Sequence, residues 1–461
     1  MTFFPEPTLT ASARDLYESV KSLPIVSPHG HCDPQWWASD TAFPDPAELL
    51  IIPDHYVFRM LYSQGVPLSE LGIGVAPGSR DPRAIFRLFA NHWHCFLGTP
   101  SREWMEFTLY RTLGVDRALS PETADIIYDL IAERLAQSEF RPRALFDAFG
   151  IDVLATTDPA NDALSAHSAI AASGWSGRII PAFRPDSVLN PARPEFGSEV
   201  DTLGALTGQD TKAYEGYLEA IRIRRAAFRA LGATATDHDV PILATTWLSR
   251  PEIERLHSGA VSGTLTDGET LAYYGHLLVE MAQMSAEDGM VMQLHVGSRR
   301  NTNRHLLEAF GRDMGSDIPV AVDWVSRMDA LLNRVGNDPR LRVILFTLDE
   351  TTYARELAPM AGHWPCLRIG PPWWFHDSPN GIRRYFDQVV ETAGYFNLAG
   401  FNDDTRAFLS IPARHDTWRR GVCSHLADQV GLGRISKADA ETLAPYLCRD
   451  QAREVYRLND A

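Results

Sequence analysis

The stretch Leu23-Pro24-Ile25-Val26-Ser27-Pro28-His29-Gly30-His31 joins a short apolar run to a pair of histidines. The run Leu23–Ser27 has the composition of a buried β-strand, and the histidines stand where that strand would end. Stretches with helical periodicity, such as Leu271–Ala286 and Trp324–Val335, lie between most of the later apolar runs. These later runs number seven: Ile151–Ala155, Arg178–Ala182, Pro241–Thr245, Met290–Leu294, Leu341–Phe346, Cys366–Ile369 and Leu398–Phe401. Strands alternating with helices predict an α/β fold, and eight such units predict a (β/α)8 barrel.

An open, doubly wound sheet is the competing fold. It usually carries a glycine-rich phosphate-binding turn after its first strand, whereas here Pro28-His29-Gly30-His31 follows the first run. We therefore favour a single barrel domain over residues 1–461. About 120 residues separate the first run from the second, far more than one crossover helix needs. Residues 40–148 are rich in helix formers and aromatic residues, which predicts a helical insertion over the barrel mouth.

The composition excludes several kinds of partner. The formal net charge of −16 argues against a nucleic-acid partner, because phosphate binding needs a basic surface. The sequence has no uncharged apolar stretch of about 18 residues and no signal-peptide pattern, so we expect neither a membrane span nor secretion. Five scattered cysteines suit a reducing compartment, which predicts a cytoplasmic protein.

Polar residues at the ends of the runs are the candidates for chemistry, because barrel active sites lie at the carboxyl ends of the strands. Residues two apart on a strand share a side, so His29 and His31 can face one cation. His295 ends the fifth run, and Asp403 and Asp404 follow the eighth, next to the first strand in a closed barrel. Two histidines and one aspartate suit Zn²⁺ or Mn²⁺. Taken singly, each histidine could be an ordinary barrel residue and each aspartate a helix cap.

Three arginines indicate the charge of the substrate. Arg184 follows the third run, Arg300 follows His295, and Arg406 follows Asp404. Guanidinium groups bind carboxylates through paired hydrogen bonds, so these arginines predict an anionic substrate. Their alternative role is structural pairing with local aspartates. Trp373 lies in a pair of tryptophans after the seventh run, where an aromatic face suits the C–H side of a sugar but is equally able to close a core.

Seven motifs, in this order, resemble those of the uronate isomerases, the glucuronate and galacturonate isomerase branch of the amidohydrolase superfamily. The resemblance covers about residues 20–430. The motifs are HGH at 29–31, DHYxFRxL at 54–61, TTDP at 156–159, FRPD at 183–186, LHVGxxRNxN at 294–303, WWF at 373–375 and DTRAFLS at 404–410.

The resemblance implies a barrel of the amidohydrolase type with one divalent metal ion, usually zinc. It implies an aldose–ketose isomerase that converts D-glucuronate to D-fructuronate, D-galacturonate to D-tagaturonate, or both. Barrels of this type commonly form homo-oligomers. The implied metal ligands are His29, His31 and Asp404. The implied polar active-site residues are His55, Tyr56, Arg184, His295, Arg300, Trp373 and Arg406.

Chemically, this isomerisation must take a proton from C2 and return one to C1. We expect Asp404 to be the general base, Tyr56 a possible partner in proton handling, and His55 a stabiliser of developing oxygen charge. The resemblance favours Asp404 over Asp403, because Asp404 directly precedes Thr405-Arg406 and so matches the Asp-Ser-Arg pattern of the family. Two alternatives remain: another metal-dependent hydrolase or decarboxylase of the amidohydrolase type acting on a carboxylated substrate, and a non-catalytic sugar-acid-binding protein.

Overall fold

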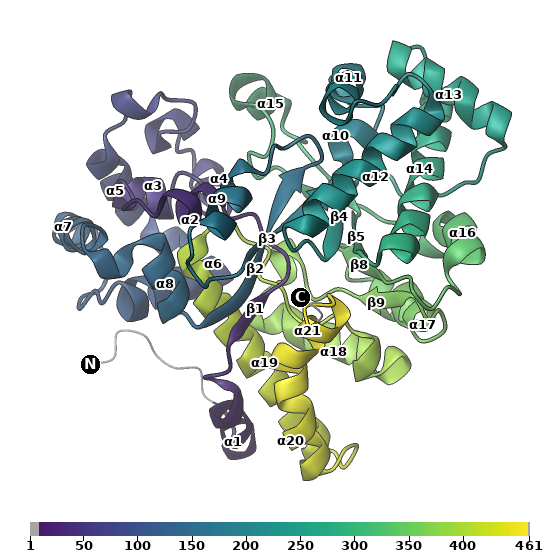
Figure 1. Ribbon diagram of the computed structural model, residues 1–461. Helices are drawn as coiled ribbons and strands as arrows, with labels where there is room; N and C mark the ends of the chain where they lie inside the picture. Colours follow the sequence, from purple (N-terminus) through teal and green to yellow (C-terminus); the bar gives the residue numbers. More distant parts are fainter. Residues whose placement is uncertain (1–8, 460–461) are drawn as a thin grey trace.

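The computed structural model describes residues 9–459 and shows a curled parallel sheet surrounded by helices (Figure 1). Seven parallel strands form this sheet in the order β1-β2-β3-β4-β5-β8-β9. A short antiparallel pair, β6 and β7, stands outside it. The strands are β1 (Ile25–Ser27), β2 (Ile151–Pro159), β3 (Ile179–Arg184), β4 (Ala235–Val240), β5 (Val291–Val296), β6 (Ser298–Arg299), β7 (Ile318–Pro319), β8 (Val343–Thr347) and β9 (Leu367–Ile369).

The eighth barrel position is filled by the segment 398–405, which forms little regular strand. Leu398 makes an isolated parallel bridge with Ile369 of β9. On the other side, the amide of Asp404 donates to the carbonyl of His29 at 3.3 Å, and the amide of His31 donates to the carbonyl of Thr405 at 3.0 Å. The backbone therefore closes the ring between the last barrel segment and the first. The barrel fold predicted from the sequence is confirmed.

The predicted fourth strand, Pro241–Thr245, is wrong. The strand is β4, six residues earlier, and Pro241–Thr245 is a loop. A search for apolar runs misses β4 because four of its six residues, Thr236 to Asp239, are polar or ionisable and all six are buried. Their burial follows from the position of β4 between β3 and β5, where neighbouring side chains pair with them.

Helices cover the outside of the sheet and fill the long connection after β1. Those between β1 and β2 are α2 (Gln35–Ser39), α3 (Pro46–Leu50), α4 (His55–Ser63), α5 (Pro82–Asn91), α6 (Pro100–Phe107), α7 (Ala124–Leu135) and α8 (Pro142–Ala148). They lie together on one side of the molecule (Figure 1). The longest of the others are α12 (Tyr214–Ala230), α14 (Asp267–Asp288), α18 (Pro379–Ala393) and α19 (Ile411–Gly431), and α16 (Trp324–Val335) is shorter.

Shorter helices complete the shell. They are α1 (Ala11–Val20), α9 (Ser165–Ala172), α10 (Asp186–Leu189), α11 (Phe196–Thr207), α13 (Arg250–Ser262), α15 (Arg304–Phe310), α17 (Ala358–Ala361), α20 (Lys437–Pro445) and α21 (Gln451–Val455). Within the described range, no helix is both long and apolar enough to cross a membrane.

The barrel interior is apolar at the end opposite the functional residues. Val26, Ile180 and Val291 of the sheet pack there with Val455 of α21 and with Tyr456. The hydroxyl of Tyr456 donates to the side-chain carbonyl of Gln293 at 3.0 Å. The C-terminal helix therefore plugs one end of the barrel and leaves the carboxyl ends of the strands as the open end.

Gly400 is expected to be essential to this plug. Its φ of +80° lies in the left-handed region, and a Cβ at this position would lie 2.5 Å from the backbone nitrogen of Ala452 in α21. Gly400→Ala is therefore expected to lower the free energy of unfolding by about 2–4 kcal/mol, through strain and overpacking together. Urea denaturation measures this loss. The control is Gly174→Ala, because Gly174 has a φ of +74° and no atom within 4 Å of the added Cβ. Equal losses in the two variants would show that contact with α21 contributes nothing.

Candidate functional site

A cavity of about 230 Å³ opens at the carboxyl ends of the barrel strands. This volume is below the roughly 300–1,000 Å³ typical of sites for drug-sized ligands and suits a monosaccharide. Of the residues predicted from the sequence, all but Tyr56 line this catalytic cavity. Its lining includes His29, His31, His55, Arg184, His295, Arg300, Trp373, Asp404 and Arg406.

His29, His31 and Asp404 meet at the centre of the cavity floor. The Nε2 atom of His29 lies 3.4 Å from Oδ1 of Asp404, and Nε2 of His31 lies 3.1 Å from the same oxygen. The backbone hydrogen bonds between residues 29–31 and 404–405 hold the two segments in this register. Asp403, the alternative carboxylate, is turned away and accepts a hydrogen bond from Nε2 of His415 at 3.2 Å. The geometry therefore favours Asp404.

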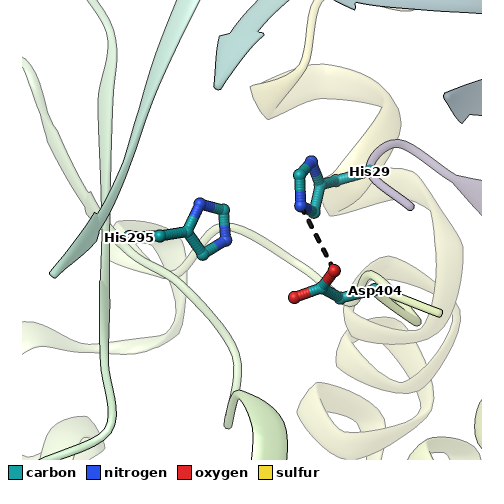
Figure 2. A group of neighbouring side chains, drawn as sticks. All are labelled: His29, His295 and Asp404. Carbon is teal, nitrogen blue, oxygen red and sulfur yellow. Dashed lines mark ion pairs between the residues drawn. The ribbon is translucent and has the colours of Figure 1, made fainter. Parts of the chain in front are cut away.

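His295 faces the same centre from β5. Figure 2 shows its ring directed toward the space beside His29 and Asp404. Its Nδ1 lies 2.7 Å from Oδ1 of Asp237, and since a carboxylate only accepts, Nδ1–H is the donor. Its Nε2 atom is buried without a hydrogen-bond partner. The bond to Asp237 thus fixes a tautomer whose Nε2 lone pair faces the cavity.

These residues fit a divalent cation. Within residues 9–459, the ligand atoms of His29, His295 and Asp404 form a group in which all lie within 4.8 Å of one another. Imidazole nitrogens with one carboxylate are a donor set suited to Zn²⁺ or Mn²⁺. The structure thus places His295 in this group, whereas His31 contacts Asp404 but is not part of the group.

The charges around the centre favour a cation. Burial opposes ionisation of Asp404, but the imidazoles of His29 and His31 outweigh it and hold the pKa of this carboxyl well below its usual range. For His29, burial would lower the pKa, yet the carboxylates of Asp404 and Asp237 raise it above the ordinary value. A position that strengthens the affinity of an imidazole for a proton offers the same negative potential to a metal ion.

Protein carboxylates contact all three predicted arginines, two of them closely. Arg184 donates through Nε to Oδ2 of Asp186 at 2.6 Å, and its Nη1 lies 3.4 Å from Oδ2 of Asp237. The Nε group of Arg300 donates to Oδ1 of Asp239 at 3.1 Å. The structural-pairing alternative therefore applies to part of each guanidinium, and their other nitrogens remain for a ligand.

Arg406 is held more loosely. Its Nη2 lies 3.5 Å from Oδ2 of Asp313, and 38% of its side chain is exposed. It follows Asp404 by two residues, so it lies beside the proposed base. Arg406 is thus the arginine of this set with the most freedom to turn toward a ligand.

The insertion contributes its residues through α4. His55 begins this helix, whose first turn is capped by the Asp54 side chain accepting from the amide of Tyr56 at 2.9 Å. The His55 ring stacks on Trp374 with centroids 4.3 Å apart, and burial lowers its pKa well below the ordinary value. Trp373, the predicted sugar platform, lies edge-on to His295 with centroids 4.8 Å apart.

Tyr56 lies outside the cavity lining and contacts a buried ion pair. Its hydroxyl donates to Oδ2 of Asp377 at 3.4 Å, and Nη1 of Arg414 donates to the same oxygen at 2.7 Å. Burial raises the pKa of Asp377 to about 7, although Arg414 opposes the shift. Burial likewise holds the pKa of Tyr56 well above its ordinary value. Tyr56 therefore stays a neutral hydroxyl.

Backbone strain is concentrated at this cavity. Seven non-glycine residues among those described have positive φ, and four of them line it: Asn301, Asp313, Trp374 and Asp404. Such conformations cost about 1–3 kcal/mol each and persist where the surroundings enforce them, commonly at functional sites. The φ of +39° at Asp404 is the case closest to the proposed chemistry.

Sequence reasoning missed the carboxylates that organise the site. Asp237 and Asp239 belong to β4, whose position was predicted wrongly, and Asp186 begins α10 after β3. Asp237 and Asp239 share one face of β4, and both line the cavity. The alternation Asp237-His238-Asp239 was the available signal, because paired polar residues two apart mark a strand end near a site as His29 and His31 do.

Asp237→Asn tests whether the carboxylate positions His295. The neutral amide holds Nδ1–H less strongly and removes a charge beside Arg184, so we expect turnover to fall by about 10–100-fold, the range for loss of a group that orients a histidine in a metal site. The pH profile of kcat should also shift, since His295 then loses its fixed tautomer. Asp239→Asn is the control, because Asp239 pairs with Arg300 rather than an imidazole and should affect mainly KM. Identical kinetics in both variants would contradict the positioning role.

Known proteins share this sequence and fold. The sequence model of the glucuronate isomerase family matches residues 6–455. The chain is 55% identical to a uronate isomerase of Rhizorhabdus wittichii, with 99% of this chain and 97% of that protein covered. The crystal structure of glucuronate isomerase from Caulobacter crescentus superposes with a TM-score of 0.96 at 48% identity, covering 99% of this chain and 96% of that one. A metal-dependent hydrolase from Lactobacillus casei, at a TM-score of 0.54, 14% identity and 96% and 98% coverage, shares the fold alone.

Proposed function

The chain belongs to the glucuronate isomerase family and is an enzyme that isomerises hexuronates, and from this premise we propose how its cavity does so. The proposed reactions are D-glucuronate to D-fructuronate, D-galacturonate to D-tagaturonate, or both. The observation that carries the proposal is the convergence of two imidazoles on the carboxylate of Asp404 beside arginines at one cavity.

We propose that His29, His31 and Asp404 hold one divalent cation, most simply Zn²⁺, with Mn²⁺ as the alternative. The contacts of both imidazoles with the Asp404 carboxylate, and the carboxylates that favour positive charge at His29, support a metal at these three residues. When bound, such a cation supplies positive charge that stabilises negative charge developing on the substrate oxygens. We expect a single cation rather than two, because β8 ends in Thr347 and supplies no histidine ligand for a second cation.

Asp404 is the proposed base. Its carboxyl stays ionised because the two imidazoles hold its pKa low, and the left-handed backbone at this residue fixes its direction. It takes the proton from C2 of the open-chain sugar and returns a proton to C1, while the hydroxyl proton of O2 passes to O1. The aldehyde thereby becomes an alcohol and the C2 alcohol becomes a ketone. His55, neutral because burial lowers its pKa, stabilises charge on the oxygens by hydrogen bonding.

The remaining residues orient the substrate. Arg184, Arg300 and Arg406 bind the C6 carboxylate through the nitrogens that the protein carboxylates leave available, and Trp373 packs beside the sugar chain. Such positioning lowers the activation barrier by holding C2 near the base. Tyr56 does not line the cavity, and its proposed part in proton handling is indirect. Its hydroxyl, Asp377 and Arg414 form a chain of buried hydrogen bonds next to His55.

Three further proposals concern the whole protein. The helices of residues 40–148 cap the barrel mouth as part of one domain, since His55 of α4 lines the cavity with residues of the barrel. The five cysteines are free, which suits the reducing cytoplasm. We also propose that the protein forms a homo-oligomer, because barrels of this type commonly self-associate.

The test is a two-sugar assay on protein loaded with Zn²⁺ or Mn²⁺. Ketose formation from D-glucuronate or D-galacturonate, lost on chelation and restored by one equivalent of cation, is the expected result. Absence of ketose from both sugars in the fully loaded protein would reject the proposed reactions. Restoration that requires two equivalents would reject the single-cation centre.

A further inference from the structure

A second cavity opens directly onto the catalytic one. This outer cavity, of about 460 Å³, lies between the loops after α10 and β4 and the β6–β7 pair. Five residues line both cavities: Arg193, Asp239, Arg300, Asn301 and Arg312. The outer cavity is therefore continuous with the catalytic cavity, and a small ligand that occupies it stands at the entrance.

The two cavities differ in charge. Five arginines and five aspartates line the catalytic cavity, so their formal charges cancel. Four arginines and a single aspartate, Asp239, line the outer cavity. A local excess of positive charge is unusual on a chain whose formal net charge is −16. The outer cavity is thus an attractive region for anions on a protein that otherwise repels them.

Two of the outer arginines lack a carboxylate partner. Among residues 9–459, no Asp or Glu oxygen forms an ion pair with Arg299 or Arg312, whereas Arg193 and Arg300 contact aspartates. Both unpaired side chains belong to exposed residues. Their positive charge is therefore compensated by solvent alone and is available to a ligand.

The backbone nevertheless holds both arginines at the cavity. Arg299 pairs with Ile318 in the β6–β7 ladder. Arg312 precedes Asp313, whose amide donates to the Asn301 side chain at 3.0 Å. The same loop packs closely on α4, since a Cβ at Gly315 would lie 2.8 Å from Cβ of Arg59. The backbone at both arginines is thus held in place, while their guanidinium groups are exposed to solvent.

We propose that the outer cavity is an anion-binding subsite that captures the carboxylate of an incoming hexuronate before the sugar enters the catalytic cavity. This inference rests on the hexuronate reaction proposed above. Arg299 and Arg312 make the first contact, and Arg193 and Arg300, which like Arg312 line both cavities, pass the carboxylate inward. Inorganic phosphate offers the same anionic chemistry and serves as a probe.

The experiment compares Arg299→Gln and the double variant Arg299→Gln/Arg312→Gln with Arg229→Gln, which removes an exposed arginine of α12 outside both cavities. Each is measured as cation-loaded enzyme at ionic strengths from about 0.01 M to 1 M, over which the Debye length falls from about 30 to 3 Å. At low salt we expect kcat/KM of the double variant to fall about 10-fold, the lower end for electrostatic steering. At high salt it should converge on the wild type.

Titration with inorganic phosphate gives a readout independent of turnover. Calorimetry should show phosphate binding to the wild type and to Arg229→Gln, and weaker binding to the double variant. Phosphate binding without any change in kcat/KM would mean a site for free phosphate and overturn the capture role. A loss of kcat/KM that persists unchanged at high salt would also overturn it. A wild type that forms no ketose would instead be a failure of the proposed reaction, even if phosphate still binds.

Discussion

Asp404→Asn is expected to lower kcat by about 10³-fold, within the range of 10²–10⁴ for loss of a general acid–base group. The amide keeps the size of the side chain but has no basic oxygen for the C2 proton. It also removes the negative charge between the His29 and His31 imidazoles, so the affinity for a divalent cation falls as well. Saturating cation separates the two effects, because the loss of the base persists when the metal site is full.

The measurement is exchange of deuterium from C2 of a labelled hexuronate into solvent, followed together with ketose formation. Both should slow in parallel in Asp404→Asn. Asp403→Asn is the matched control, since Asp403 is the neighbouring buried carboxylate but faces His415. It should retain much more C2 exchange than Asp404→Asn. Normal turnover by the cation-saturated Asp404→Asn protein would show that another group takes the proton.

The sequence was sufficient to predict the fold and to bring the candidate residues to one cavity, because both follow from strand ends. His29, His31 and His295 end apolar runs that form β1 and β5, and Asp404 follows the last barrel segment. Strand order in a barrel brings these ends together whatever the loops do. This is why residues about 375 positions apart, His29 and the Asp403-Asp404 pair, could be predicted to lie at one place, while the choice of Asp404 came from the family resemblance.

The features that the sequence did not predict, β4 and the partners of the arginines, depend on tertiary contacts. β4 is buried through hydrogen bonds and ion pairs rather than apolar contact, so no hydrophobic run marks it. The partners of an arginine depend on which strands are neighbours, so the pairing of Arg300 with Asp239 could not be read from its own surroundings in the sequence. The left-handed residues around the cavity likewise reflect tertiary packing rather than local propensity.

His29→Ala is expected to weaken cation binding by more than about 100-fold, beyond the upper end for loss of a merely supporting group. His29 is buried and contacts Asp404, and the surrounding carboxylates favour positive charge at its position. Zn²⁺ content after dialysis, together with a competition titration against a chelator, measures the loss.

The same titration on His31→Ala and His295→Ala identifies the third ligand. The two candidates differ in their partners. Within residues 9–459, the only ion pair of His31 is with Asp404, whereas His295 is held by Asp237 and belongs to the group whose ligand atoms lie within 4.8 Å. We expect His31→Ala to lose cation affinity nearly as severely as His29→Ala, because residues two apart at the end of β1 share a side. His295→Ala should keep the cation and lose turnover. The reverse pattern would assign His295 to the metal and leave His31 to the substrate, since one carboxylate and two imidazoles complete the centre in either case.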